Sequence, residues 1–248
     1  PINHSTTFFK DGSQLFDPHL VGTETLGNQM KTSQTCREVL EVLKKLSPNN
    51  DVDFAKEFYE KGLETFGENW VYADINTALL TISKNIKVEN YMEIGVRRGR
   101  SMTMMASQSP GANFYGFDMW IEDYCDSPNP GPEFVKEELS KVGYQGKIEF
   151  INGDSKKTVP SFFKKNKNLF FDVITVDGDH SIGGAKIDLN NVIGRLKIGG
   201  VLVFDDISSQ EHAYLNRLWD KQIKSRKDFY TYEYFDLGLG VAIAIRKY

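Results

Sequence analysis

Apolar residues recur at helical spacing through the first third of the chain, between residues 29 and 84. Ser47-Pro48 and Gly67 interrupt this pattern, because a helix rarely continues through the residue before a proline or through a glycine. We therefore expect three helices that form a cap ahead of a sheet: Gln29–Leu46, Asp53–Phe66 and Trp70–Lys84.

After residue 90 the pattern changes to short apolar runs separated by helical segments, which is typical of a parallel sheet with crossover helices. The runs predict five strands: Tyr91–Ile94, Asn113–Phe117, Lys147–Asn152, Phe171–Val176 and Val201–Phe204. Helices are expected between them at Ser101–Ser107, Glu133–Val142, Thr158–Lys165 and Gly183–Leu196.

The end of the chain has a different pattern. Thr231–Phe235 and Val241–Arg246 are two alternating β runs joined by a glycine-containing turn, so they predict an antiparallel hairpin. The fold class is therefore α/β, with a doubly wound, mostly parallel seven-stranded sheet and an N-terminal helical cap. We divide the chain into residues 1–69, the arm and cap, and residues 70–248, the sheet domain.

Composition agrees with a folded domain and excludes some partners. The 248 residues are 40% hydrophobic and 26% charged, and the net charge of -4 provides no general attraction for nucleic acid or an anionic membrane. Lysines do cluster between residues 156 and 168, but Phe162 and Phe163 interrupt them at helical spacing. This pattern favours a solvated helix face over a polyanion site, so we expect neither nucleic acid nor membrane as a partner.

Two cysteines, Cys36 and Cys125, are too few and too far apart to suggest a disulfide framework or a metal site. No apolar run approaches the roughly 20 residues that span a bilayer, and the first residues lack the pattern of a secretory signal. We therefore expect a cytoplasmic protein, for which a homo-oligomer remains open.

The segment MEIGVRRGRS, residues 92–101, follows a predicted strand and opens a helix. A doubly wound sheet leaves a ligand crevice at such a place. Gly95 and Gly99 would allow a tight turn and a close approach of the backbone, although a turn without a ligand could use the same glycines. Acidic residues also occur at three successive strand ends: Glu93 lies at the end of the first strand, and Asp118 and Asp154 come just after the next two. Each could be a helix cap, but together they indicate an acidic rim around a ligand.

These segments, together with YGFDMW, INGDS, ITVDGDHS, the LKIGG turn and the terminal hairpin, resemble the class I S-adenosylmethionine-dependent methyltransferases over residues 70–248. The resemblance implies a Rossmann-like fold and S-adenosylmethionine as cofactor. In that family pattern Glu93 and Ser101 hold the methionine end, Asp118 binds the ribose and Asp154 binds the adenine amine. The implied cofactor site comprises Glu93, Gly95, Gly99, Ser101, Asp118, Met119, Trp120, Asp154 and Ser155.

Three arginines in the glycine turn, Arg97, Arg98 and Arg100, depart from this pattern, since they would repel a sulfonium and suit a pyrophosphate. They keep a nucleotide-dependent Rossmann oxidoreductase as the alternative function, although the glycine spacing differs from G-x-G-x-x-G. For a methyltransferase we expect at least some of these arginines to point to solvent or to clamp the methionine carboxylate. A non-catalytic S-adenosylmethionine-binding protein is a third hypothesis.

The strands that end in DGDH and FDD are expected to be neighbours about 4.8 Å apart. Their ends would bring Asp177, Asp179, Asp205 and Asp206 together. Two carboxylates about 5 Å apart repel by roughly 3 kcal/mol at an effective dielectric of about 20, so a divalent cation, above all Mg²⁺, is a natural ligand. The alternative is structural, with Asp205 and Asp206 capping a helix and Asp177 accepting from a backbone amide.

The DGDH and DD segments are similar to those of metal-dependent sugar O-methyltransferases. The resemblance implies that Asp177, Asp205 and Asp206 ligate the metal and that the acceptor is a hydroxyl of a small polar metabolite such as a sugar. A base must remove the hydroxyl proton. Asp179 is the first candidate for this base and His180 the second. Nothing in the sequence around His4, His19 or His212 indicates that they are ligands.

The turn-rich insertion from Glu122 to Phe134 predicts either a lid over the cofactor or a surface loop. Tyr72, Trp120 and Tyr124 are candidate aromatics for the acceptor site, although core packing is the commoner role of such residues.

Overall fold

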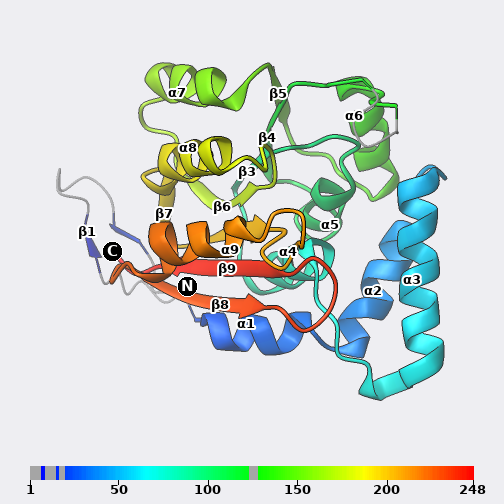
Figure 1. The fold of residues 1–248 in the computed structure, drawn as a ribbon. Helices are drawn as coiled ribbons and strands as arrows, with labels where there is room; N and C mark the ends of the chain where they lie inside the picture. The colour runs from blue at the N-terminus through cyan, green and yellow to red at the C-terminus, as the bar shows by residue number, and fades with distance from the viewer. Residues whose placement is uncertain (1–6, 9–14, 17–19, 123–127) are drawn as a thin grey trace.

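The computed structural model describes residues 7–8, 15–16, 20–122 and 128–248 of the chain. A mixed sheet crosses its middle and helices cover both faces of the sheet (Figure 1). In the described residues the sheet has seven strands in the order β5-β4-β3-β6-β7-β9-β8. The strands are β3 (Asn90–Ile94), β4 (Asn113–Asp118), β5 (Ile148–Asn152), β6 (Phe171–Val176), β7 (Leu196–Asp205), β8 (Phe229–Tyr234) and β9 (Val241–Arg246).

Strands β3 to β7 are parallel, whereas β9 runs antiparallel to both of its neighbours, β7 and β8. The predicted fold class, a mostly parallel seven-stranded sheet with an antiparallel C-terminal hairpin, is therefore confirmed. The chain passes from β3 to β4 on one side and later returns to β6 on the other side of β3. At such a switch point the carboxyl ends of the strands border a crevice.

Alternation along each strand sends side chains into two separate cores. In β3, Tyr91 packs into one core while Met92 and Ile94 pack into the other. The first core lies against α1 (Thr23–Met30), α4 (Ile75–Asn85) and α5 (Arg100–Gln108). The second lies against α7 (Ser155–Lys165), α8 (Ile182–Ile193) and α9 (Tyr214–Trp219). Phe162 and Phe163 of α7 are buried in this second core, so the neighbouring lysines occupy the helix face that points away from it.

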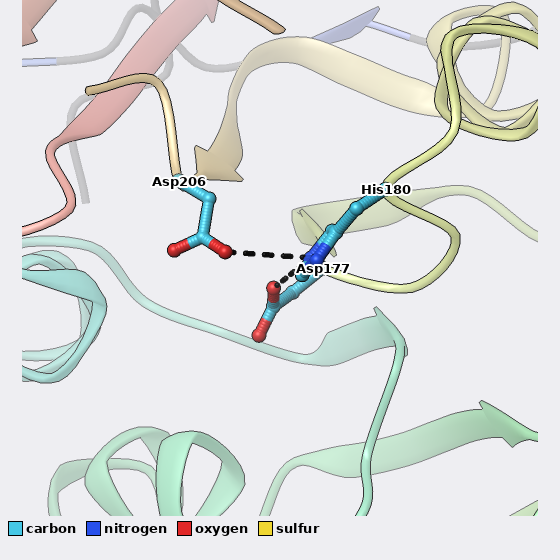
Figure 2. Close-up of side chains that lie close together, drawn as sticks. All are labelled: Asp177, His180 and Asp206. Carbon is cyan, nitrogen blue, oxygen red and sulfur yellow. Dashed lines mark hydrogen bonds and ion pairs between the residues drawn. The ribbon is translucent and has the colours of Figure 1, made fainter. Parts of the chain in front are cut away.

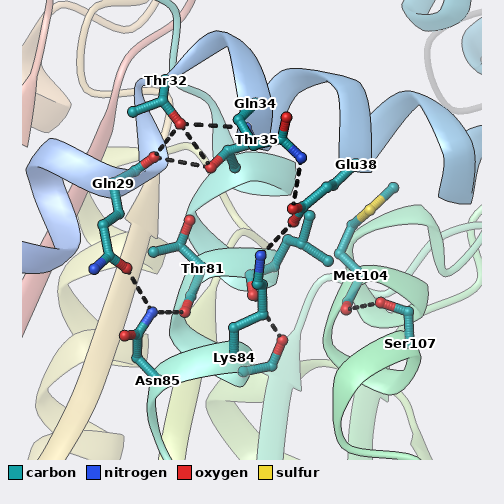
Figure 3. Close-up of polar contacts among 12 residues, drawn as sticks. Gln29, Thr32, Gln34, Thr35, Glu38, Thr81, Lys84, Asn85, Met104 and Ser107 are labelled. Carbon is teal, nitrogen blue, oxygen red and sulfur yellow. Dashed lines mark hydrogen bonds and ion pairs between the residues drawn. The ribbon is translucent and has the colours of Figure 1, made fainter.

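The predicted first helix is in fact two helices. Helix α1 ends at Met30 and α2 (Ser33–Leu43) begins after Thr32, whose backbone is extended and whose hydroxyl accepts a hydrogen bond from the Thr35 amide. Figure 3 shows the hydroxyls of Thr32 and Thr35 also donating to the Gln29 carbonyl. These side chains satisfy the backbone groups at the corner, so the helix breaks although the apolar period continues across it.

Polar contacts attach this corner to the helix beneath it. Lys84 of α4 pairs with Glu38 of α2 at 2.5 Å, and the Asn85 amide donates to the side chain of Gln29 at 2.7 Å (Figure 3). Helix α3 (Asn50–Phe66) packs against α2, and a 3-10 turn, Gly67–Asn69, follows it.

The remaining elements include one predicted helix, α6, and several elements that were not predicted. Helix α6 (Pro132–Lys141) packs on α5, and a two-stranded hairpin pairs β1 (Thr7–Phe8) with β2 (Leu15–Phe16). Helix α9 continues into a π-helical turn, Asp220–Lys224, and neither was predicted. Cys36 is buried and free, while Cys125 lies outside the described residues.

Asp74 organises the start of α4 and the aromatic residues around it. Its carboxylate accepts hydrogen bonds from the Thr77 amide at 3.0 Å, from the Tyr59 hydroxyl at 2.8 Å and from the Asn76 amide group at 2.9 Å. Tyr59 is buried and packs against Trp70 and other rings of the cap. One carboxylate thus caps a helix and satisfies a buried hydroxyl, which explains why α4 begins at Ile75 rather than at Trp70.

We expect the substitution Asp74→Ala to lower the free energy of unfolding by about 2–3 kcal/mol, since it removes the cap and leaves the Tyr59 hydroxyl without its acceptor. Urea denaturation followed by circular dichroism measures this. The matched control is Asn49→Ala, which removes the cap of α3 but no buried partner and should cost about 1 kcal/mol. Equal losses in the two variants would contradict the role of Asp74.

Candidate functional site

A cleft of about 1090 Å³ opens at the carboxyl ends of the parallel strands. Its walls are the turns that follow β3, β4, β5, β6 and β7, together with the turn of the C-terminal hairpin. The residues that line it include Gly95, Arg97, Arg100, Asp118, Met119, Ile121, Asp154, Ser155, Lys156, Asp177, Asp179, His180, Asp205, Asp206, Ser208, His212 and Leu239.

The two glycines of the first turn are each required by a different close contact. Gly95 has φ +91°, and a Cβ there would lie 1.9 Å from the carbonyl oxygen of Asp177. Gly99 has φ +74°, and a Cβ there would lie 2.6 Å from Val135 of α6. Gly95 therefore lets the turns after β3 and β6 touch inside the cleft, while Gly99 lies outside the cleft lining and makes room for α6.

Glu93 lies beneath the cleft rather than in its wall. It is fully buried, accepts a hydrogen bond from Ser101 Oγ at 2.5 Å and accepts another from the Tyr91 hydroxyl. Burial raises the pKa of Glu93 to about 8, against the opposing effect of these two hydrogen bonds. Ser101 is likewise buried, so this pair supports the floor of the cleft. Its predicted contact with the methionine end stays a prediction.

Asp118 connects two turns of unusual backbone conformation. Its carboxylate accepts from the Arg97 amide at 2.7 Å and from the Trp120 amide at 2.5 Å. Both donors have left-handed backbones, with φ 50° at Arg97 and φ 54° at Trp120. Such conformations are unfavourable for residues other than glycine, so the Asp118 carboxylate helps to stabilise both turns.

Of the residues that follow β4 and β5, some line the cleft and others lie outside it. Met119 lines the cleft and is 56% exposed, whereas Trp120 packs against Phe150 and donates to Asn152 at 2.7 Å outside the cleft lining. Asp154 lines the cleft and also caps α7 through the Lys156 amide.

The three arginines of the glycine turn go to different places. Arg97 pairs with Asp51 of the cap at 3.2 Å. Arg98 donates to the Pro128 carbonyl and lies over the Phe134 ring. Arg97 and Arg100 line the cleft. Two of the three arginines therefore line the cleft, and one of these two, Arg97, is paired with a carboxylate of the cap.

Three side chains from neighbouring turns meet at the β6 side of the cleft (Figure 2). His180 Nε2 lies 3.2 Å from Asp177 Oδ1 and 3.6 Å from Asp206 Oδ2, and one ligand atom of each residue falls within 4.8 Å of the others. Asp205 lines the cleft but is not part of this group. Of the predicted metal ligands, Asp177 and Asp206 lie together, and the third residue of the group is His180 rather than Asp205.

Burial and mutual repulsion perturb the titration of these carboxylates. Burial, with Asp177 as the next cause, raises the pKa of Asp206 to about 6, and burial together with Asp177 and Asp206 raises the pKa of Asp205 well above its usual range. The hydrogen bond with Asp177 raises the pKa of His180. Carboxylates that repel one another in this way fit a divalent cation, which would stabilise their ionised forms.

Asp179 lies in the same wall but has a different partner. Its carboxylate pairs with Lys156 Nζ at 2.9 Å and accepts from the Ser181 amide at 2.9 Å. Burial alone would raise the pKa of Asp179, but hydrogen bonds from Lys156 and Ser181 hold it below its ordinary value. Asp179 is therefore ionised at neutral pH.

Sequence reasoning missed His212, which lines the cleft with its ring centroid 5.1 Å from that of His180. The Tyr214 hydroxyl donates to the His180 carbonyl at 2.6 Å and lies 3.0 Å from His212 Nδ1. No motif marks His212, because it follows β7 in a segment without a predicted element. Asp188 of α8 was also missed; it is fully buried beneath Gly178, and burial raises its pKa to about 6.

Two further predictions meet the limits of the described residues. The predicted lid contains residues 123–127, and Tyr124 among them lies outside the described part of the chain, as do His4 and His19. Tyr72 is buried and stacks on Trp70 at 5.2 Å, so it packs in the cap. Every helix in the described ranges is too short or too polar to cross a bilayer.

Comparisons with known proteins agree with this architecture. Residues 92–207 match the family described as "Methyltransferase domain". The chain is similar to the O-methyltransferase TomG from Streptomyces achromogenes solved with S-adenosylmethionine, with 15% identity, a TM-score of 0.57 and coverage of 82% of this chain and 92% of TomG. It is also similar to CalS11, a TDP-rhamnose 3'-O-methyltransferase, with 17% identity, a TM-score of 0.52 and coverage of 86% and 93%.

An O-methyltransferase from Bacillus cereus, solved with S-adenosylhomocysteine, gives 14% identity, a TM-score of 0.53 and coverage of 86% of this chain and 91% of that one. At such identities the likeness is one of fold. No curated protein matches the sequence. The matched family and the shared fold confirm the resemblance predicted from the motifs.

The buried Glu93 makes stability depend on pH. A carboxyl whose folded pKa lies near 8 favours the folded state fully below its unfolded pKa, about 4.5, and loses that contribution as pH rises through 8. Between pH 5.5 and 9 the wild type should therefore lose on the order of 3 kcal/mol relative to Glu93→Gln, whose side chain stays neutral. Urea denaturation of both proteins at several pH values measures this.

A second buried glutamate provides the control. Glu138 accepts from the Ser47 amide at 2.8 Å and from Lys141 at 2.7 Å, and these partners outweigh burial and lower its pKa. The stability difference between the wild type and Glu138→Gln should stay constant from pH 6 to 9. A constant difference for Glu93→Gln as well would show that Glu93 is ionised in the folded protein.

Proposed function

We propose that this chain, whose residues 92–207 match a methyltransferase domain, transfers a methyl group from S-adenosylmethionine to an oxygen of a small molecule. The observation that supports this most is the convergence of carboxylates from the ends of β4 to β7 on one cleft. S-adenosylmethionine supplies a methyl group on a positively charged sulfur and bears no phosphate, so an acidic wall suits it.

The donor would occupy the half of the cleft between the turns after β3, β4 and β5. Gly95 lets the turns after β3 and β6 meet at that floor, and Asp118 presents its carboxylate at the end of β4, where a ribose diol would donate to it. Arg97 pairs with Asp51 and Arg98 donates to the Pro128 carbonyl, so Arg100 is the arginine of this turn left to neutralise a pyrophosphate. A dinucleotide needs that neutralisation, so this arrangement favours the methyltransferase over the oxidoreductase alternative.

The acceptor hydroxyl would lie on the β6 side. Asp177, His180 and Asp206 are the residues that would hold a divalent cation there, and such an ion lowers the pKa of a hydroxyl and orients its oxygen. We propose Asp179 as the base, because it lines the cleft as an ionised carboxylate. Lys156 holds that carboxylate in place and would stabilise it between turnovers.

The acceptor itself is proposed to be a small polar metabolite with an apolar face, such as a sugar or a glycoside. The inner wall is rich in carboxylates. Three apolar side chains also line the cleft and are about half exposed: Met119 (56%), Ile121 (49%) and Leu239 (58%). A cleft of about 1090 Å³ has room for a donor and a small acceptor together. The similarity to CalS11 in fold adds support for a sugar.

Calorimetry should show binding of S-adenosylmethionine and S-adenosylhomocysteine but not of NAD. Transfer of labelled methyl groups to a panel of hydroxylated metabolites then identifies the acceptor. With that acceptor, Asp177→Asn and Asp206→Asn should each lower divalent-stimulated transfer by at least about 100-fold, because the site loses a charged ligand. The affinity for S-adenosylhomocysteine should change less than about threefold, since neither residue belongs to the donor half.

The control is Glu41→Gln, which removes an exposed ion pair with Lys44 outside the cleft lining and should leave both quantities unchanged. Binding of NAD in place of the methyl donor would refute the proposal. Binding of the donor without transfer to any hydroxylated compound would point to a non-catalytic binding protein instead.

A further inference from the structure

We propose that Arg100 selects an acceptor that carries an oxyanion, a carboxylate or a phosphate group, in addition to the hydroxyl that is methylated. This rests on the proposed methyl transfer and narrows its acceptor from small polar metabolites to anionic ones, such as sugar phosphates or sugar acids. The sequence associated the arginines of this turn with a pyrophosphate or with the methionine carboxylate. Here Arg100 is assigned to the second substrate instead.

Arg100 differs from the other cations of the cleft in having no counterion among the described residues. Three arginine or lysine side chains line the cleft: Arg97, Arg100 and Lys156. Arg97 pairs with Asp51 at 3.2 Å. Lys156 pairs with Asp179 at 2.9 Å. Within the described ranges, no residue forms an ion pair or hydrogen bond with the Arg100 guanidinium, so its five N–H donors remain for a ligand.

The backbone at Arg100 is fixed, so the side chain extends from a defined point. The Gly99 amide donates to the Val96 carbonyl at 2.8 Å, and the Thr103 hydroxyl donates to the Arg100 carbonyl at 2.6 Å. The next side chain, Ser101, is buried and donates its proton beneath the cleft. Helix α5 therefore begins with one side chain in the cleft wall and the next one under it, and Arg100 is the one that a ligand meets.

The charge of Arg100 acts on the side of the cleft that the proposed function assigns to the acceptor. Burial and Asp177 raise the pKa of Asp206, whereas His180, His212 and Arg100 each act to lower it. Asp206 lies beside Asp177 and His180 on that side (Figure 2). An acceptor that lies against these residues is therefore within the field of the guanidinium.

Several carboxylates of the cleft are already engaged by the chain. The Asp118 carboxylate accepts from two backbone amides, and Asp154 caps α7. Asp179 is paired with Lys156. The negative charge of these groups is thus partly compensated, while the positive charge of Arg100 is not paired with any described residue. An anion can therefore bind at Arg100 although acidic residues line the same cleft.

The chemistry of guanidinium favours an oxyanion over a neutral group. Its planar fork matches the two oxygens of a carboxylate or phosphate, and such charge-assisted pairs are stronger than hydrogen bonds to neutral hydroxyls. A guanidinium without a counterion would also repel the sulfonium of the methyl donor. An oxyanion on the acceptor would remove that repulsion, whereas a neutral sugar would leave it.

The test uses protein saturated with S-adenosylhomocysteine, which retains the methionine carboxylate. An arginine that clamped this carboxylate would already be occupied, so anion binding to the saturated protein reports the acceptor side. The probes are glucose, glucose 1-phosphate and glucuronate, measured by calorimetry. We expect glucose 1-phosphate, glucuronate or both to bind at least about tenfold more tightly than glucose. The tighter of the two anionic probes shows whether the site prefers phosphate or carboxylate.

Arg100→Gln should remove this preference. The affinity for the anionic probe should fall about 10–100-fold, and that for glucose should change less than about threefold. Arg100→Lys should keep part of the preference, because lysine retains the charge but lacks the planar fork. The matched control is Arg37→Gln, which removes an exposed ion pair with Glu68 outside the cleft lining and should behave as the wild type. Circular dichroism verifies that each variant is folded.

No preference for an anionic probe in the wild type, or an unchanged preference in Arg100→Gln, would overturn the proposal. A loss of S-adenosylhomocysteine affinity of tenfold or more in Arg100→Gln would also overturn it, because Arg100 would then bind the donor carboxylate. Each of these results would leave the proposed methyl transfer standing. Failure of the wild type to bind S-adenosylhomocysteine would instead refute the proposed function, and this inference with it.

Discussion

The contact between the turns after β3 and β6 is the constraint on which the rest of the site depends. Gly95 lies so close to the Asp177 carbonyl that a side chain would not fit between them. The Gly95 amide donates to the Phe117 carbonyl and the Asp177 amide to the Ile94 carbonyl, so β4, β3 and β6 end at one level. Because the strands stop together, residues from distant parts of the chain face a single cleft.

The sequence was sufficient for the sheet because its strands are short apolar runs bounded by glycine and aspartate, and because buried parallel strands have no competing helical period. It was insufficient at the corner between α1 and α2, where the apolar period continues through residues whose hydroxyls break the helix. The elements that follow β7 were also not predicted from the sequence. Its α9 is short and continues into a π-helical turn, so no regular period announces it.

The candidate site was predictable as a set of strand ends but not as a set of side-chain directions. Asp205 and Asp206 are adjacent, and adjacent residues in a strand point to opposite faces. Asp206 has a left-handed backbone, with φ 63°, and lies beside Asp177 and His180. The sequence contains no sign of this conformation. Trp120 is also left-handed, and it packs against Phe150 rather than in the cleft. His212 lies in a segment without a predicted element, so its place in the cleft could be found only from the folded chain.

Within the described part of the chain, each carboxylate oxygen of Asp118 accepts one hydrogen bond, from the Arg97 amide or from the Trp120 amide. A carboxylate oxygen has a second lone pair, so each remains able to accept another proton donor. The surface offered to a ligand is therefore fixed by the chain itself before the ligand arrives. Association then loses little conformational entropy to loop ordering. The two strained left-handed residues therefore keep the site in a conformation that can bind a ligand without rearrangement.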